Sequence, residues 1–291
     1  MQRKEKRKLK KLSKTDSTNC NHSTSISLMW FNSNNRLLAI SSVLKNKLRE
    51  MNCIYAGISE TGVINEPSLS DKTYTFSSGI EKPPTEYKSR PKACFGSFRK
   101  TNINASTILI GKYVMFDRVE LSGMRPLYLG TCYLPCLQNS TWTRECEDNL
   151  FQELIQYIDE LSKKGEIMFG GDFNATIPLA FPGAHADTTT DPHQKKIQRG
   201  ERLSHLFKHF NLSVVNNMLP DNAEHHTWIK PFKGKLKTSI LDYVICSNNL
   251  TQYIDSFSIL DESFASDHCM LQVRLSNLPP QTKDHLQSSI R

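Results

Sequence analysis

The sequence has no apolar run that approaches the roughly 18 residues needed for a membrane-spanning helix. Hydrophobic residues make up only 38% of the chain, and the mean hydropathy is −0.47. No apolar segment follows the basic N-terminus, so the sequence carries no recognisable secretory signal. We therefore expect a protein that does not insert into membranes and that works in the nucleus or the cytoplasm.

The sequence also lacks closely paired cysteines. None of its eight cysteines forms a Cys-x-x-Cys pair, the spacing found in many zinc and redox sites. Cys132, Cys246 and Cys269 lie inside apolar runs, where cysteine behaves as a small hydrophobic residue. Without a secretory signal, reduced thiols in an intracellular protein are the better interpretation.

Almost all of the net positive charge lies in the first 14 residues. The formal net charge is +8, and residues 1–14 alone contribute +7, which leaves +1 for the rest of the chain. A block of like charges repels itself and favours disorder. Residues 1–25 are therefore predicted to form a disordered basic arm that docks on nucleic acid or acts as a nuclear address. A solubilising tail is the alternative interpretation of this segment.

The remaining chain is long enough to bury a sizeable core, and one domain over residues 26–278 is the expectation. Residues 279–291 are predicted to be a disordered polar tail. Residues 62–92, rich in Ser, Pro and Lys, are expected to be irregular, as an insertion or a substrate-facing loop.

Hydrophobic periodicity indicates the order of the elements. A strand, an amphipathic helix and a second strand are predicted at 26–32, 36–52 and 53–60, which favours parallel pairing. Further helices are predicted at 144–163 and 199–210. The other candidate strands are 92–98, 106–111, 113–121, 127–135, 166–171, 212–218, 226–231, 239–247, 256–260 and 269–275. This pattern predicts an α/β fold, a four-layered α/β/β/α sandwich of two mixed or mostly antiparallel sheets flanked by helices.

Polar residues recur at the ends of the predicted strands. They are Asn32, Asn34, Glu60, Tyr133, Asp172, Asn174, Asp242, Asp267 and His268. Carboxylates hold hard divalent cations, amides and imidazoles donate to phosphoryl oxygens, and an aspartate can orient or deprotonate water. If the strand ends meet at one edge, this set indicates metal-assisted phosphoester hydrolysis. Taken singly, each residue also has an ordinary structural role, such as an Asx-turn at Asp172.

Seven motifs resemble those of the exonuclease-endonuclease-phosphatase superfamily, most closely the AP-endonuclease-like endonucleases of non-LTR (LINE-type) retrotransposons. They are "MWFNSNNRL", "AGISET", "TCYLP", "GGDFNA", "HTWIKP", "LDYVICS" and "SDHCML". The similarity spans about residues 27–276, and its most specific part is the pairing of GDFN with SDH in this order. There are departures: Gly62 stands where the family usually has Trp or His, and Ile240 where retrotransposon relatives often have Arg.

The resemblance implies a metal site and a water-activating residue. Glu60 would bind Mg²⁺, or alternatively Mn²⁺, with Asp267 close by and Asn34 assisting. Asp172 would position or activate the attacking water, although the sequence does not decide which aspartate is the base.

The resemblance also implies how the phosphate is held. Asn32 and Asn174 would grip the phosphate, and Tyr133 would contact it. His268 would stabilise the pentacovalent phosphate or transfer a proton, and Asp242 would orient the imidazole.

The implied function is an endonuclease that nicks duplex DNA and leaves 3′-hydroxyl ends, as in retrotransposon target-site cleavage. The alternatives within the superfamily are an AP endonuclease, an RNA deadenylase or an inositol-phosphate phosphatase, so RNA remains a possible partner. A catalytically weak nucleic-acid-binding remnant is the alternative from another class. The basic segments 195–202 and 230–237 could grip a phosphate backbone or be solvated loops.

Overall fold

The computed structural model describes eight ranges of the chain, which are 25–63, 66–79, 95–121, 123–137, 142–178, 191–219, 226–262 and 264–278. The predicted arm, apart from Ser25, and the predicted tail at 279–291 lie outside these ranges. No helix within them is long and apolar enough to span a membrane.

The strands of the described ranges form two sheets of six and one separate hairpin. The first sheet has the spatial order β13 (Ile254–Leu260), β14 (Met270–Leu275), β1 (Ile26–Asn32), β2 (Cys53–Ser59), β4 (Gly96–Lys100) and β3 (Tyr74–Ser78). The second has the order β5 (Ala105–Ile110), β6 (Val114–Val119), β7 (Leu127–Tyr133), β8 (Glu166–Asp172), β12 (Asp242–Ser247) and β9 (Leu212–Val214). The hairpin consists of β10 (Trp228–Phe232) and β11 (Lys235–Ser239).

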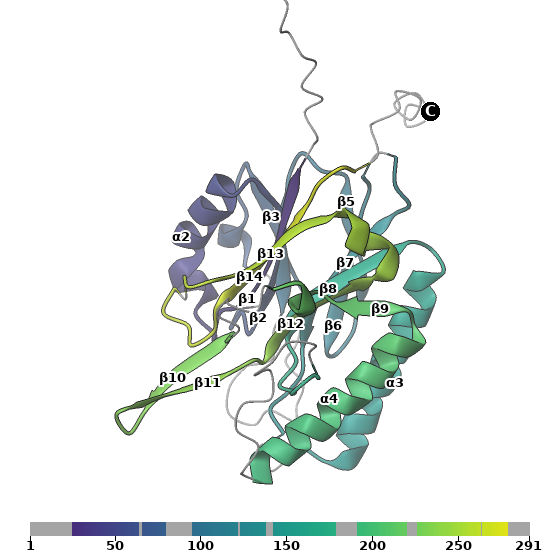
Figure 1. Ribbon diagram of the computed structural model, residues 1–291. Helices are drawn as coiled ribbons and strands as arrows, with labels where there is room; N and C mark the ends of the chain where they lie inside the picture. Colours follow the sequence, from purple (N-terminus) through teal and green to yellow (C-terminus); the bar gives the residue numbers. More distant parts are fainter. Residues whose placement is uncertain are drawn as a thin grey trace, which may run out of the picture.

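The two sheets lie face to face and helices cover their outer faces (Figure 1). On the first sheet, α2 (Leu37–Glu50) buries its apolar face, and Leu44 shares a core cluster with Phe31. On the second sheet, α3 (Arg144–Ser162) and α4 (Asp191–His209) pack side by side, and Leu154 and Phe207 share a cluster with Phe169. The predicted α/β/β/α sandwich is confirmed.

Two parallel strand pairs fix one edge of the molecule. Strands β1 and β2 are parallel and joined through α2, and β7 and β8 are parallel and joined through α3. Asn32 and Asp172, the last residues of β1 and β8, are in hydrogen-bond contact, so the carboxyl ends of both pairs lie at the same edge. Strands β12 and β14 run antiparallel to β8 and β1, so their first residues reach the same edge. In the ladder, Asp172 pairs with both Tyr133 and Asp242.

The sheets approach each other closely where β1 crosses β8. The Trp30 indole is fully buried between the sheets and donates to the carbonyl of Gly130 at 2.8 Å. Gly170 makes room for it, because a Cβ at this position would lie 2.9 Å from the indole and 2.8 Å from the Tyr243 carbonyl. Side chains alternate with a period of two along a strand. Asn32 and Asp172, two residues beyond Trp30 and Gly170, therefore point into the same gap.

Several sequence-based predictions of local structure are wrong. Residues 62–92 are not irregular throughout, because β3 lies within them. It is an edge strand, and its short sequence YTFSS shows no clear apolar alternation. The strand predicted at 212–218 stops at Val214 and continues as a 3₁₀ turn, since the side chain of Asn216 is used to bind the backbone of β12. The strand β11 was not predicted.

We expect Gly170→Ala to destabilise the fold by about 1–3 kcal/mol, because the added methyl group overpacks the gap beside Trp30. Trp30→Phe should relieve part of that strain, so the double variant should lose less stability than the sum of the two single variants. Urea unfolding of the four proteins measures this. Strict additivity would show that the close packing of Trp30 on Gly170 is not a constraint on the fold.

Candidate active site

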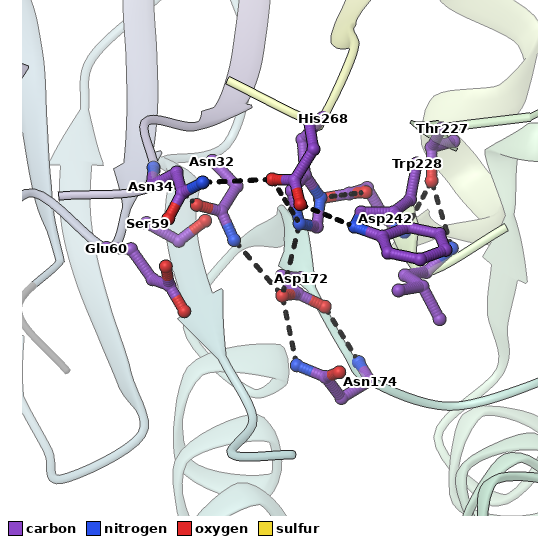
Figure 2. A network of polar contacts seen from close by, with 12 residues as sticks. Asn32, Asn34, Ser59, Glu60, Asp172, Asn174, Thr227, Trp228, Asp242 and His268 are labelled. Atoms are coloured by element: carbon purple, nitrogen blue, oxygen red, sulfur yellow. Dashed lines mark hydrogen bonds and ion pairs between the residues drawn. The ribbon is translucent and has the colours of Figure 1, made fainter. Parts of the chain in front are cut away.

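The carboxylate of Asp172 lies at the centre of the shared edge and links the two sheets (Figure 2). Its Oδ2 accepts from Nδ2 of Asn32, on β1, at 3.1 Å and from Nδ2 of Asn174 at 3.0 Å. Its Oδ1 accepts from the backbone amide of Asn174 at 2.9 Å. The residue is only 2% exposed. Three donors therefore fix this carboxylate in one orientation.

The segment after β8 is shaped to return Asn174 to Asp172. Asn174 has a φ of +43°, a left-handed conformation that asparagine tolerates better than most residues. Its side-chain amide donates to the carbonyl of Leu134 as well as to Asp172, so both N–H groups point at protein acceptors. The Asx-type turn that was the alternative interpretation of Asp172 is present, and it holds the Asp172 carboxylate.

A buried histidine–aspartate pair lies beside this carboxylate. Nδ1 of His268 is 2.8 Å from Oδ2 of Asp242, so the imidazole is oriented by the first residue of β12. Nε2 of His268 lies 4.0 Å from Oδ2 of Asp172 and 4.0 Å from Oδ1 of Asp267. The imidazole therefore presents Nε2 to the space between two further carboxylates (Figure 2).

The pKa values of His268 and Asp172 are both raised in this cluster. Burial disfavours the imidazolium, but Asp242, Asp172 and Asp267 outweigh it and raise the pKa of His268 to about 10. Burial also raises the pKa of Asp172, and although His268 opposes this, Asp242 and Glu60 add to it and the pKa reaches about 7. At neutral pH the imidazole thus carries a proton, while Asp172 can gain or lose one.

Two consecutive asparagines hold the predicted metal ligands. Nδ2 of Asn34 donates to Oδ1 of Asp267 at 3.1 Å, and Nδ2 of Asn35 donates to Oε2 of Glu60 at 3.4 Å. Asn34, Asn35 and Glu60 all have left-handed φ values, of 48°, 62° and 48°. Such conformations persist only where the surroundings enforce them, and here Ser33 and Asn35 donate to the carbonyl of Glu60.

The donors at this edge fit a hard, partly hydrated cation. They are oxygen atoms of carboxylates and amides, from Glu60, Asp267 and Asn34, without a sulfur atom. Within the described ranges no group of three or more His, Cys, Asp or Glu side chains is arranged as a metal-binding cluster. Mg²⁺ commonly binds through one or two carboxylates and keeps several waters, so it does not require such a cluster. The same donors suit Mn²⁺.

Tyr133 reaches the edge from β7, the strand next to β8. It pairs with Asp172 in the parallel ladder, and its ring is buried in a cluster with Phe95 and Met115. Directly paired residues of neighbouring strands project to the same face. Tyr133 therefore lies between the sheets, beside the carboxylate, with most of its surface buried by apolar packing.

Four polar residues that the sequence analysis did not place in the site support it from behind. Thr227 Oγ1 accepts from the backbone amides of Leu241 and Asp242, both at 2.9 Å. Trp228 donates its indole N–H to Oδ2 of Asp267 at 3.0 Å. The other two are Ser266, which donates to the carbonyl of Asn32 and accepts from the amide of His268, and Asn216, which binds the backbone on both sides of Tyr243.

These four residues gave a weak sequence signal. Thr227 and Trp228 lie in the quoted "HTWIKP" motif, and Ser266 begins "SDHCML", so the motifs marked the segments. Their contacts were not foreseeable, because each partner lies at least 14 residues away or on the backbone.

The predicted basic segments are regular structure, not loops. Residues 195–202 belong to α4, where Arg199 is buried and Arg202 pairs with Asp148. Residues 230–237 form most of the β10–β11 hairpin, which projects from the molecule (Figure 1). Its first residue, Trp228, contacts Asp267 of the site.

The sequence profile of the endonuclease-reverse transcriptase family matches residues 127–272, half of the chain. The matched part includes six of the nine predicted site residues, Tyr133, Asp172, Asn174, Asp242, Asp267 and His268. The chain belongs to this family. The family is part of the exonuclease-endonuclease-phosphatase superfamily, so the resemblance seen in the motifs is confirmed. A comparison with curated proteins finds no significant match.

Among the solved structures that share the fold of this chain are the following three. The endonuclease domain of TRAS1, a telomere-specific non-LTR retrotransposon, aligns with a TM-score of 0.63 at 14% identity, over 86% of this chain and 98% of that one. The AP endonuclease LMAP from Leishmania major aligns with a TM-score of 0.67 at 14% identity, over 90% and 91%. D. rerio TDP2, solved with a single-strand DNA product, aligns with a TM-score of 0.59 at 15% identity, over 86% and 98%. At such identities the likeness shows the fold.

Mg²⁺ is expected to stabilise the folded protein relative to EDTA, by about 2.7 kcal/mol at a concentration of one hundred times Kd. Glu60→Gln should abolish most of this gain, because the variant loses the charged ligand. Glu66→Gln is the matched control, since that partly exposed residue caps a 3₁₀ turn through Ser68. Thermal unfolding with and without Mg²⁺ measures the difference. Equal stabilisation of wild type and Glu60→Gln would exclude Glu60 as a ligand.

Proposed function

We propose that this chain is a metal-dependent endonuclease that nicks duplex DNA and leaves 3′-hydroxyl and 5′-phosphate ends. One observation carries the proposal. A buried carboxylate, Asp172, is fixed by two amides and lies 4.0 Å from Nε2 of an imidazole that is itself oriented by Asp242. A phosphoryl group placed beside Nε2 would meet a proton acceptor and a cationic donor together.

In this proposal His268 is a donor. Its raised pKa keeps the imidazole protonated at neutral pH, so Nε2–H can donate to a phosphoryl oxygen as negative charge builds there. Asp242 holds Nδ1–H and keeps the ring in place. A protonated imidazole cannot accept a proton from water, which leaves that task to another group.

Asp172 is the group we assign to that task. Its raised pKa brings it close to the working pH, where a general base is most effective. The amide of Asn32 and both the amide and the backbone N–H of Asn174 hold the carboxylate, so it needs little reorganisation before it accepts the proton. Since both side-chain N–H groups of Asn174 are directed at protein acceptors, we assign the phosphate contact to Asn32.

A bound Mg²⁺ would neutralise charge on the phosphate and stabilise the leaving oxygen. Glu60 is the residue we assign to hold it, with Asn34 and Asp267 beside it. Asp267 is also bound by Trp228, so the metal region and the base of the hairpin are directly connected.

The hairpin supports a polyanionic substrate. Lys230, Lys233, Lys235 and Lys237 lie on it and are all exposed, and Lys230 approaches Asp267 to 3.8 Å at the edge of the site. Repeated cations on a projecting element suit the phosphate backbone of a nucleic acid, because the interaction grows with each phosphate neutralised. A single small phosphate ester would use few of them.

We expect Asp172→Ala to lower the nicking rate of supercoiled plasmid by about 10²–10⁴-fold, the usual contribution of a general base. His268→Ala should lower it by about 10²–10³-fold through loss of a donor to the developing charge. Nicking in Mg²⁺, with EDTA as the blank, gives both rates. Asp255→Ala and His209→Ala, exposed residues away from the edge, are the matched controls and should keep the wild-type rate.

Wild-type rates in both site variants would refute the proposal. Abasic duplex, single-stranded RNA and inositol phosphates serve as alternative substrates in the same assay. If the protein prefers one of these substrates over intact duplex, the proposed phosphoester hydrolysis stands but the proposed substrate class is wrong.

A binding remnant is the second candidate, favoured by the +7 charge of residues 1–14. Deletion of residues 1–25 separates the two functions. An endonuclease should bind DNA more weakly and with a smaller salt dependence, by about 0.9 in slope for each phosphate that the arm had neutralised, yet keep Mg²⁺-dependent cleavage. Fluorescence anisotropy and plasmid nicking on the same preparation measure both. Weaker binding after the deletion, without any cleavage before or after it, would favour the remnant.

A further inference from the structure

A fully buried guanidinium group lies behind the candidate site and has no part in the chemistry described so far. Arg199, on α4, has a side chain that is only 1% exposed. Its Nε and Nη2 donate to the two carboxylate oxygens of Glu147, on α3, at 2.8 and 2.6 Å. Burial of an ion pair costs free energy that its own attraction often fails to recover. Such a pair therefore calls for a reason beyond stability.

The remaining nitrogen of Arg199 points toward the site. Nη1 donates to the carbonyl of Pro135 at 2.7 Å and approaches the carbonyls of Phe173 and Asn174 at 3.4 Å each. These carbonyls belong to the two segments that follow β7 and β8. One planar group thus joins two helices to both segments on which Asn174 depends.

Glu147 is held ionised in this arrangement. Its burial opposes ionisation, but Arg199 outweighs burial and the pKa of Glu147 is lowered. The carboxylate also accepts from the indole N–H of Trp142 at 2.7 Å. Both carboxylate oxygens therefore have partners, and the guanidinium cannot turn away from the carbonyls without breaking the bidentate pair.

The backbone of α4 also contacts the segment that follows β8. The amide of Thr176 donates to the carbonyl of Lys196 at 3.0 Å. Gly200 permits this approach, since a Cβ there would lie 1.8 Å from the carbonyl oxygen of Thr176. Residues 173–176 are therefore fastened to α4 at two points, once through the Arg199 side chain and once through the backbone.

The segment fastened in this way carries Asn174, whose left-handed backbone and whose side chain both aim at Asp172. The second acceptor of its amide, the Leu134 carbonyl, immediately precedes Pro135. Arg199 therefore contacts Asn174 itself and the residue next to each of its two acceptors, Pro135 after Leu134 and Phe173 after Asp172.

We propose that Arg199, paired with Glu147, is a positioning residue that sets the orientation of Asn174 and through it the Asp172 carboxylate. The inference rests on the proposed function for its kinetic consequence, but the geometry is testable without it. Arg199 reaches no reacting atom, so it acts on turnover and not on substrate binding.

Lysine cannot replace arginine here. An ammonium group is a compact point charge with three donors, and it cannot form a bidentate pair with Glu147 while also bridging carbonyls of two segments. We expect Arg199→Lys to lower kcat by about 10–100-fold with KM nearly unchanged, because small displacements of a catalytic group carry losses of this size.

Arg202→Lys is the matched control. Arg202 lies on the same helix and pairs with Asp148 of α3 at 3.0 Å, and its guanidinium lies 3.9 Å over the Phe151 ring, but it touches neither segment of the site. This variant should keep kcat within about twofold of wild type. Thermal unfolding of both variants separates a kinetic effect from loss of the fold.

The decisive kinetic test is non-additivity. If Arg199 acts through Asn174, then Arg199→Lys should cost little further activity in an Asn174→Ala background. Glu147→Gln, which preserves size, gives a second variant should Arg199→Lys fail to fold, and it should show the same pattern. Equal losses from Arg199→Lys in the two backgrounds would overturn the inference.

A spectroscopic readout keeps this inference distinct from the proposed function. The side-chain amide signals of Asn174, identified in ¹H–¹⁵N spectra by their loss in Asn174→Ala, should shift in Arg199→Lys and stay in place in Arg202→Lys. Unchanged Asn174 signals in Arg199→Lys would overturn the positioning role. A shift in a protein that cleaves no substrate would uphold that role and refute the nuclease.

Discussion

The packing of Trp30 against Gly170 holds the two sheets at the separation on which the site depends. The indole fills the gap left by the glycine and ties β1 to the carbonyl of Gly130. Two residues further along each strand, this separation becomes the 3.1 Å contact between Asn32 and Asp172. A sandwich of two sheets thereby gains a carboxylate that is held from both sides, although the two residues lie 140 positions apart in the chain.

The residues of the site destabilise the fold locally, and packing and hydrogen bonds elsewhere must compensate for this. Asp172, Asp242 and Asp267 crowd around one imidazolium, Glu60 adds a further negative charge that acts on Asp172, and burial makes the repulsion between the carboxylates stronger. Left-handed backbone at Asn34, Asn35, Glu60 and Asn174 adds strain at the same edge. Hydrogen bonds made by Thr227, Ser266 and Trp228 hold the residues of this cluster in place. A divalent cation bound together with a phosphodiester would reduce the excess negative charge of the carboxylates. Binding of both would therefore be favoured at this edge.

Much of the fold and the centre of the site could be predicted from the sequence, because apolar periodicity marked most strands and polar residues marked where they end. Asp172, Asn174, Asp242 and His268 meet as expected, since the end of β8 and the beginnings of the antiparallel strands β12 and β14 reach the same edge. Short polar strands such as β3 carried too little alternation to be recognised. Arg199 could not be told apart from Arg202 in the same basic segment, because nothing local distinguishes the two. Its burial depends on Glu147 and on carbonyls of segments distant in sequence.

We propose that this edge activates water to attack a phosphodiester. Cleavage of duplex DNA in H₂¹⁸O, with analysis of both new ends by mass spectrometry, tests this most directly. We expect one ¹⁸O atom in the 5′-phosphate and an unlabelled hydroxyl at the 3′ end, because water attacks phosphorus and the 3′ oxygen leaves. A labelled 3′-phosphate, or ends that carry no ¹⁸O, would contradict it.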